Sequence, residues 1–225
     1  MRLLVVLFGF ALVLSGCATL SEDECQLADW NARGIADGQN GETPARFQRY
    51  TEACNRFGIA PDFAAWEAGR KTGLKTFCTP QGIYSAGLRR RGDPGQCGFD
   101  PELNRIHRTT SRYAELEVAL TSARRAYESV LSGFEWDRRN IRNMRRRLAR
   151  DDLGKDERKR AERSLRNSLN DLDTYPFRER QARSRMRELE FAFDDARLEL
   201  RLLERELGFG SGSDIRRRQR FDPLF

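Results

Sequence analysis

The sequence predicts a mainly α-helical protein: a small, disulfide-stapled helical N-terminal domain followed by a long antiparallel coiled-coil hairpin. Three observations favour this fold class. Four cysteines cluster between residues 25 and 97, and the last 128 residues contain none. After residue 100, apolar residues recur at steps of three and four, which is typical of helices that pair along a seam. Charge and composition also change over 95–101, so we expect domains at 18–100 and 101–208.

The first 17 residues resemble the signal peptide of a bacterial lipoprotein. A basic start is followed by an apolar run over 3–14, which is too short to cross a bilayer of roughly 30 Å. The run ends in Leu-Ser-Gly-Cys, which resembles a lipobox. The resemblance implies cleavage before Cys17, lipidation of that cysteine and an anchor in the cell envelope. Ala18 favours the outer membrane, facing the periplasm. The alternative is an ordinary signal peptide with a chance cysteine.

The remaining cysteines are even in number, namely Cys25, Cys54, Cys78 and Cys97. In an exported domain this count predicts two disulfides. Spacing alone does not choose among the three possible pairings. A zinc site of four thiolates is the competing interpretation, and the absence of a Cys-x-x-Cys pair argues against it.

Short helices are expected in the small domain near 24–38, 44–57, 62–76 and 80–90. In this domain an aromatic residue is repeatedly followed by glycine three or four residues later, which places both on one helix face. Glycine lets a second backbone approach closely there. Because glycine weakens a helix interior by about 1 kcal/mol relative to alanine, its repeated use indicates a packing role.

These residues also carry a resemblance to bacterial lipoproteins of the domain-of-unknown-function family 2799. It covers about residues 22–98 and implies no known activity, cofactor or catalytic residue. The matching pattern is Cys25, Trp30, Gly34, Asp37, Gly38, Cys54, Asp62, Trp66, Gly69, Arg70, Gly73, Leu74, Phe77, Cys78, Gly82, Gly87 and Cys97.

The aromatic residues of the small domain allow two interpretations. Trp30, Trp66 and Tyr84 could line a sugar- or peptide-binding cleft with nearby charged residues. Alternatively they form the core, and the charged residues Asp37, Asp62 and Arg70 are helix caps or surface pairs. We favour the core, because a small disulfide domain needs its aromatic residues to build one.

The second part reads as two helical arms joined near residue 153. In both arms the spacing of apolar residues alternates between three and four with few exceptions. Folding about residue 153 sets Asp137 beside Ser168 and Ile141 beside Leu165, so polar layers and apolar layers match. This agreement predicts an antiparallel hairpin within one chain rather than an open dimer.

Two residues raise the question whether the hairpin is continuous. Gly133 interrupts the first arm and Pro176 the second, at nearly the same level. Proline inside a helix removes a hydrogen bond and kinks the chain. We expect a bent hairpin, and a shorter bundle with a helix end near 173–175 is the alternative.

Basic residues concentrate around the turn of the hairpin. Residues 138–166 contain 13 Lys and Arg but five Asp and Glu, a net charge of +8. A flexible basic tail is expected over 209–225, although its apolar end could also dock on its own domain. The candidate partner-binding residues are Arg138, Arg139, Arg145, Arg146, Arg147, Lys159 and Arg160.

The sequence favours a non-catalytic envelope scaffold or tether whose basic hairpin end meets an anionic partner. Peptidoglycan, lipopolysaccharide or another envelope protein are the expected partners, and nucleic acid is not, because the signal peptide argues against a cytosolic location. We expect no enzyme, cofactor or metal site, since no catalytic motif is present. The alternative is a periplasmic binding or chaperone-like module that uses the helical arms or an aromatic cleft.

Overall fold

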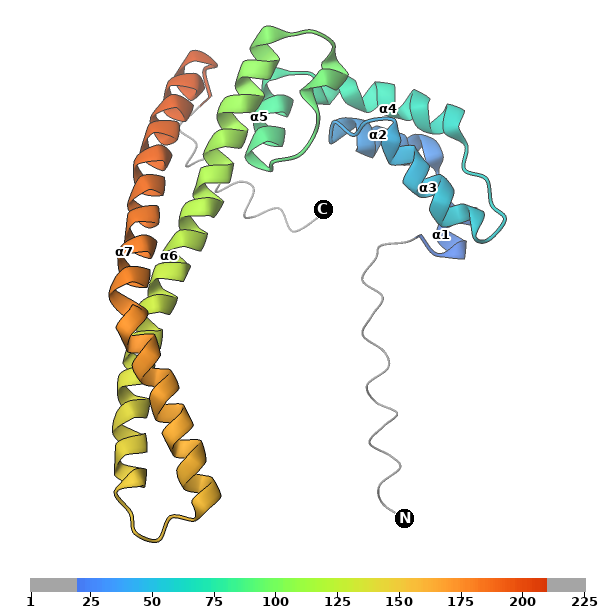
Figure 1. Cartoon of the computed structure of the whole chain (residues 1–225). Coiled ribbons are helices and arrows are strands. Elements are labelled where there is room, and N and C mark those ends of the chain that lie inside the picture. The colour runs from blue at the N-terminus through green and yellow to red at the C-terminus, as the bar shows by residue number, and fades with distance from the viewer. Residues whose placement is uncertain (1–19, 210–225) are drawn as a thin grey trace, which may run out of the picture. The chain divides into compact units, whose positions relative to one another are not determined.

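A computed structural model describes residues 20–209, and in this range it contains α-helices and one 3-10 helix but no strand (Figure 1). The mainly α-helical class is confirmed. The chain divides into two compact units: one runs through Gly87 and resumes over Arg91–His107, and the other comprises Leu88–Arg90 and the chain from Arg108 onward. The predicted signal peptide 1–17, Cys17 and all but the first residue of the predicted tail lie outside the described residues.

The first unit begins with two helices where the sequence analysis predicted one. Helix α1 covers Glu22–Gln26 and α2 covers Trp30–Gln39, so the single helix expected over 24–38 is wrong. The chain breaks because the side chain of Asp29 accepts the backbone N–H of Ala32 at 2.9 Å and thereby caps a new helix. Asp29, followed by an apolar residue, is a capping signal that could have been recognised.

The other helices of this unit lie within two residues of their predicted ranges. Helix α3 covers Ala45–Asn55, α4 covers Phe63–Phe77 and α5 covers Pro80–Leu88, and the 3-10 helix η1 follows at Pro94–Cys97. The carboxylate of Asp62 caps α4 by accepting the backbone N–H of Ala65 at 2.9 Å. Its role is therefore structural, as favoured above.

Helices α2 and α4 pack backbone to backbone through four glycines. A Cβ at Gly34 or Gly38 would overlap the carbonyl oxygens of Trp66 and Arg70 in α4. Conversely, a Cβ at Gly69 or Gly73 would overlap carbonyl oxygens of α2. Contacts advance along both helices together, so α2 and α4 run in the same direction. The close backbone approach predicted from the glycine spacing is confirmed.

Two disulfides complete this unit, as predicted, and the zinc alternative is excluded because all four thiols are consumed. Cys25 pairs with Cys54, which ties α1 to the end of α3. Cys78 pairs with Cys97, which ties the end of α4 to η1. The pairing is therefore between neighbours in sequence, a choice that spacing alone left open.

The second unit is dominated by two long helices. Helix α6 covers Pro101–Leu148 and α7 covers Lys155–Glu206. Along α6, residues of increasing number contact residues of decreasing number in α7. Arg112 pairs with Glu199 at 2.9 Å, and Asn140 donates to Ser164 at 3.1 Å. The two helices are thus antiparallel, and they wrap around each other in Figure 1.

Both helices run through the residues that could have interrupted them. Gly133 lies within α6 and Pro176 lies within α7, so the alternative of a helix end near 173–175 is wrong. Just before the proline, the Asp171 carbonyl accepts from the side chains of Thr174 and Arg178 at 3.0 and 2.9 Å. Pro176 itself leaves the Leu172 carbonyl, four residues earlier, without its N–H donor, so these two bonds lie one position before the missing one.

Candidate functional site

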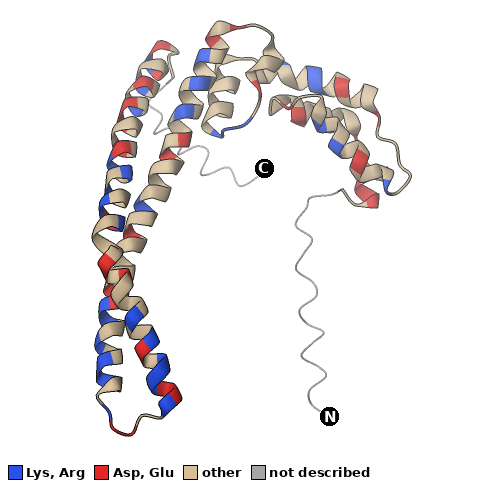
Figure 2. Cartoon of the chain, viewed as in Figure 1, with Lys and Arg blue, Asp and Glu red and all other residues tan. Residues whose placement is uncertain are grey.

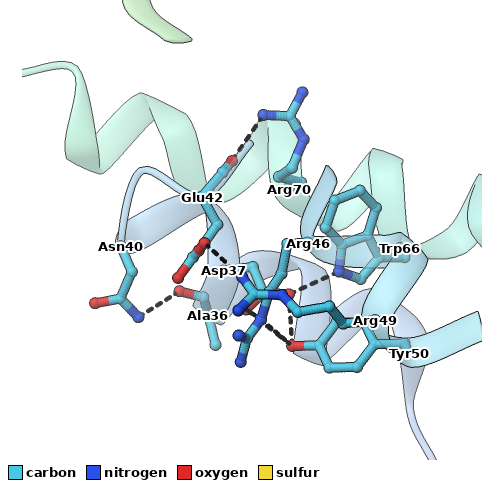
Figure 3. A network of polar contacts seen from close by, with 9 residues as sticks. All are labelled: Ala36, Asp37, Asn40, Glu42, Arg46, Arg49, Tyr50, Trp66 and Arg70. Carbon is cyan, nitrogen blue, oxygen red and sulfur yellow. Dashed lines mark hydrogen bonds and ion pairs between the residues drawn. The ribbon is translucent and has the colours of Figure 1, made fainter. Parts of the chain in front are cut away.

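The buried carboxylate of Asp37 connects three helices of the first unit (Figure 3). Asp37 lies on α2 and is 7% exposed. It accepts the indole N–H of Trp66 at 2.8 Å and the hydroxyl of Tyr50 at 2.9 Å. The guanidinium of Arg46 lies 3.8 Å away. The carboxylate is therefore paired within the protein, as expected for a buried charge with a structural role.

The hydroxyl of Tyr50 acts as a hydrogen-bond donor to Asp37 in this network. Burial raises the pKa of its hydroxyl above the ordinary value of 10.0, and the neighbouring Asp37 carboxylate raises it further. The hydroxyl accepts from Arg46 at 3.1 Å while it donates to Asp37. At neutral pH the phenol therefore keeps its proton, and the contact to Asp37 is retained.

Arg70 joins α4 to the segments around it. It is 6% exposed and makes a two-pronged contact with Glu67 at 2.7 and 3.0 Å. The hydrogen bond from Arg70 lowers the pKa of the Glu67 carboxyl. The same guanidinium also donates to the carbonyl of Glu42 and the side chain of Gln96 at 3.2 and 3.1 Å. Arg70 thus holds a loop and η1 against α4.

The aromatic residues form a core rather than a cleft. Trp30, Trp66 and Tyr84 are 9, 0 and 1% exposed. The first two pack with Phe47, Tyr50 and the Cys25–Cys54 bridge. This contradicts the alternative of an aromatic binding cleft. The first unit therefore offers a folded platform, and the concentrated charge of the chain lies elsewhere.

Basic residues are concentrated in the two helices near the end of the hairpin, where Figure 2 shows blue segments at the lower end of the view. On α6, Arg139, Arg142 and Arg146 recur at steps of three and four and are exposed, and Arg150, two residues beyond the end of α6, continues the row. Helical geometry places this row opposite the seam that includes buried Ile141. The row therefore points away from α7.

A second basic row lies on the outward face of α7. Lys155, Lys159, Arg163 and Arg166 are exposed and recur at steps of four and three. They face away from Ala161 and Ser168, which are buried on the seam. The sequence analysis did not select five members of the two rows, although their helical spacing would have revealed them: Arg142, Arg150, Lys155, Arg163 and Arg166. Positive charge thus covers two opposite sides of the hairpin end.

Few of these cations are neutralised within the described structure. Among the residues predicted to bind a partner, Arg138 pairs with Glu135 at 3.4 Å and Arg147 with Glu157 at 3.9 Å. Arg146 donates to the Asn143 side chain at 2.6 Å. No ion pair within the described residues involves the other predicted residues, Arg139, Arg145, Lys159 and Arg160. These remain available to an external anion.

The turn itself differs from the rows beside it. It carries Asp151 and Asp152, and the first turn of α7 adds Asp156 and Glu157. Arg150 pairs with Asp152 at 2.6 Å. Arg158 donates to the carbonyls of Leu148 and Arg150, both at 3.1 Å, and so caps the end of α6. An anionic partner would therefore meet the sides of the hairpin end rather than its outermost loop.

Comparison with protein families identifies the first part of the chain. A family model described as protein of unknown function (DUF2799) matches residues 29–114. The resemblance to this family is confirmed for that segment, which spans α2 to α5 and the start of α6. The match starts later and ends later than the expected 22–98, and it leaves Cys25 outside. Searches of curated proteins and of solved structures found no match.

Two further features bear on the kind of site. No group of three or more His, Cys, Asp or Glu side chains in residues 20–209 is arranged to hold a metal ion. No helix in the same range is long and apolar enough to cross a membrane. The two basic rows are thus the strongest candidate binding surface of the described chain.

Proposed function

We propose that the protein is a non-catalytic lipoprotein of the bacterial outer membrane that faces the periplasm and acts as a scaffold or tether. In this proposal a lipid on Cys17 holds the N-terminal side at the membrane. The basic hairpin end binds an anionic partner of the envelope, such as peptidoglycan or lipopolysaccharide.

The observation that carries this proposal is the pair of outward basic rows. Three residues on α6, Arg150 just beyond its end and four residues on α7 line opposite sides of one hairpin end, and most have no acidic partner within the described residues. Arginine presents a planar fork that suits carboxylates and phosphates. Exposed charges separated by more than about 8 Å are screened at physiological salt, so such a cluster acts on a polymer that meets many cations at once.

The shape of the arms suits a tether. Helix α6 has 48 residues, which corresponds to a rod of about 72 Å. The basic rows occupy the end of this rod, and the turn there is short. A rod of this kind holds a binding surface at a distance without requiring a catalytic centre.

The anchor rests on the motif at residues 14–17, and fatty-acid labelling tests it. Cells that express the wild type should incorporate labelled fatty acid into the protein, whereas Cys17→Ser should incorporate none. Equal labelling of both proteins would exclude lipidation at Cys17.

Co-sedimentation with purified peptidoglycan, and in parallel binding to lipopolysaccharide, tests the basic surface. The variant Arg139→Glu/Arg142→Glu/Arg146→Glu reverses the α6 row and changes the charge by six units. We expect binding to fall at least tenfold, and wild-type binding to weaken as salt rises. All three residues are exposed, so the helical circular dichroism signal should be preserved.

A matched control reverses three exposed arginines elsewhere on the hairpin. Arg180→Glu/Arg187→Glu/Arg197→Glu makes the same change in net charge outside 138–166. Binding should then fall far less than in the first variant. Equal losses in both variants would mean that net charge alone matters. Suppression of the aggregation of unfolded clients, without binding to either polymer, would instead support the chaperone-like alternative.

A further inference from the structure

Helix α7 carries a second apolar stripe on the side away from α6. Phe191, Leu198 and Leu202 are 74, 52 and 50% exposed. Their spacing of seven and four places them on one face, opposite the seam residues Leu189, Ala196, Leu200 and Leu203, which are buried. The stripe is about 16 Å long. A row of exposed apolar side chains that does not serve the seam indicates a docking surface.

One edge of this stripe is acidic. Glu188, Asp195, Glu199 and Glu206 follow it at steps of seven and four. Glu199 pairs with Arg112 of α6 and Glu188 with Arg185, whereas Asp195 has no ion pair among the described residues. Between residues 188 and 206 the helix contains seven acidic and three basic residues, a net charge of −4, although the whole chain has a net charge of +7. The three basic residues of this range, Arg197, Arg201 and Arg205, lie along the other edge of the stripe. The stripe and its acidic edge therefore suit an occupant that is both apolar and basic.

The chain supplies such a segment directly after α7. Residues 210–225 lie outside the described residues, and their sequence begins with a Gly- and Ser-rich stretch. The segment then combines four arginines with four apolar residues, namely Arg216, Arg217, Arg218, Arg220, Ile215, Phe221, Leu224 and Phe225. Its composition complements both the stripe and the acidic edge.

The end of α7 directs the chain off the helix axis. Gly208 has a φ of +68°, which is a left-handed conformation that favours glycine. The N–H of Phe209 donates to the Glu204 carbonyl at 2.8 Å, and the N–H of Gly208 donates to the Arg205 carbonyl at 3.3 Å. This pair of bonds defines a Schellman motif, which stops the helix and turns the chain.

The segment after α7 is also long enough to reach the apolar stripe. Measured along the helix, Leu202 lies about 10 Å and Phe191 about 27 Å before Phe209. Five extended residues, 210–214, reach up to about 17 Å, and the following residues extend further. The segment can therefore run back over the whole stripe.

We infer that residues 215–225 dock along the outer face of α7, with their apolar side chains on Phe191, Leu198 and Leu202 and their arginines on the acidic edge. A second copy of the chain fits this surface less well. The stripe offers such a copy three side chains, which are few against the roughly 20–30 residues per side of a stable interface. The inference does not rest on the proposed envelope function.

Limited trypsin digestion of the purified protein tests this docking, because Arg216–Arg220 are cleavage sites. Cleavage within this tail is followed by mass spectrometry. In Phe191→Ser/Leu198→Ser the apolar contacts are lost, so tail cleavage should be about tenfold faster than in the wild type. The control Phe177→Ser/Leu169→Ser removes the same residue types from exposed positions on the same helix, and its tail should be cleaved at the wild-type rate.

Two outcomes would overturn the inference. The first is a wild-type tail that is cleaved as fast as that of Phe191→Ser/Leu198→Ser. The second is a wild-type dimer that this variant converts to a monomer in sedimentation, which would assign the stripe to a second copy. Since the substituted residues are exposed, equal helical content by circular dichroism should confirm that all variants are folded.

Discussion

The α2–α4 pair and the α6–α7 pair are two different ways to join helices. In the first, Gly34 and Gly69 let the helix backbones touch, and any side chain there would collide with a carbonyl group. In the second, side chains meet along a seam, and a Cβ at Gly133 would meet no atom within 4 Å. Glycine is thus essential for packing in one pair and only a weak helix former in the other.

The two pairs also differ in how evenly they bury residues. The first unit concentrates aromatic residues and a disulfide in one core. In the hairpin, the buried residues gather toward both ends, and none lies between Leu120 and Asp137 on α6 or between Ser168 and Leu189 on α7. The middle is held by partly buried contacts such as the stacked rings of Phe134 and Tyr175. The compact core is stabilised by a disulfide and by close packing in one place, whereas the long seam is stabilised by many small contacts along its length.

The largest expected effect concerns the disulfide support of the first unit. Cys25→Ser/Cys54→Ser removes a bridge between residues 29 apart, and the free energy of unfolding of this unit should fall by about 3–4 kcal/mol. Denaturant titration in a Trp136→Phe background measures it, because tryptophan fluorescence then reports only Trp30 and Trp66. The hairpin transition, followed by circular dichroism, should not move. A parallel shift of both transitions would contradict the independence of the two regions.

A pair of identical substitutions sharpens the comparison of the two helix pairs. Gly69→Ala forces α2 and α4 apart and should destabilise the first unit by about 2–3 kcal/mol. Gly133→Ala meets open space inside α6 and should stabilise the hairpin by about 0.5–1 kcal/mol. Denaturant titration of each variant checks both signs. If both substitutions changed the free energy of unfolding in the same direction, close packing of the α2 and α4 backbones would not be the reason for glycine at position 69.

An effect smaller than that of Gly69→Ala concerns a buried polar layer in the hairpin. Asp137 is 5% exposed, and one of its carboxylate oxygens has no hydrogen-bond partner. Asp137→Leu should raise the free energy of unfolding of the hairpin by about 1–2 kcal/mol, because a buried, poorly satisfied carboxylate is replaced by an apolar side chain. Thermal unfolding followed by circular dichroism measures the gain. The control Ile141→Asp places a carboxylate at a buried apolar position of the same seam and should destabilise the hairpin. A loss of stability in Asp137→Leu would contradict the prediction, because it would show that the Asp137 carboxylate stabilises the seam.

The polar layer also marks the limit of what spacing predicted. The predicted position of the polar layer along the hairpin was right, since Asp137 and Ser168 are both buried in the seam. However, the hydroxyl of Ser168 accepts from Asn140 at 2.8 Å, and no hydrogen bond joins it to Asp137 within the described residues. Asn140 stands one position off the predicted seam. Long polar side chains reach across from the edge of a seam, so a strict heptad pattern does not identify them.

By itself the sequence determined the features that depend on local or periodic signals. Heptad spacing defined the two arms, their antiparallel pairing and their approximate register, because residues three and four apart share a helix face. The glycine and cysteine patterns predicted close helix packing and two disulfides. Only the tertiary structure decided the partners: Cys25 with Cys54, Gly34 with the Trp66 carbonyl, and Asp37 with Tyr50 and Trp66. These contacts join segments far apart in the chain, and their choice depends on how whole helices dock, which no short-range pattern records.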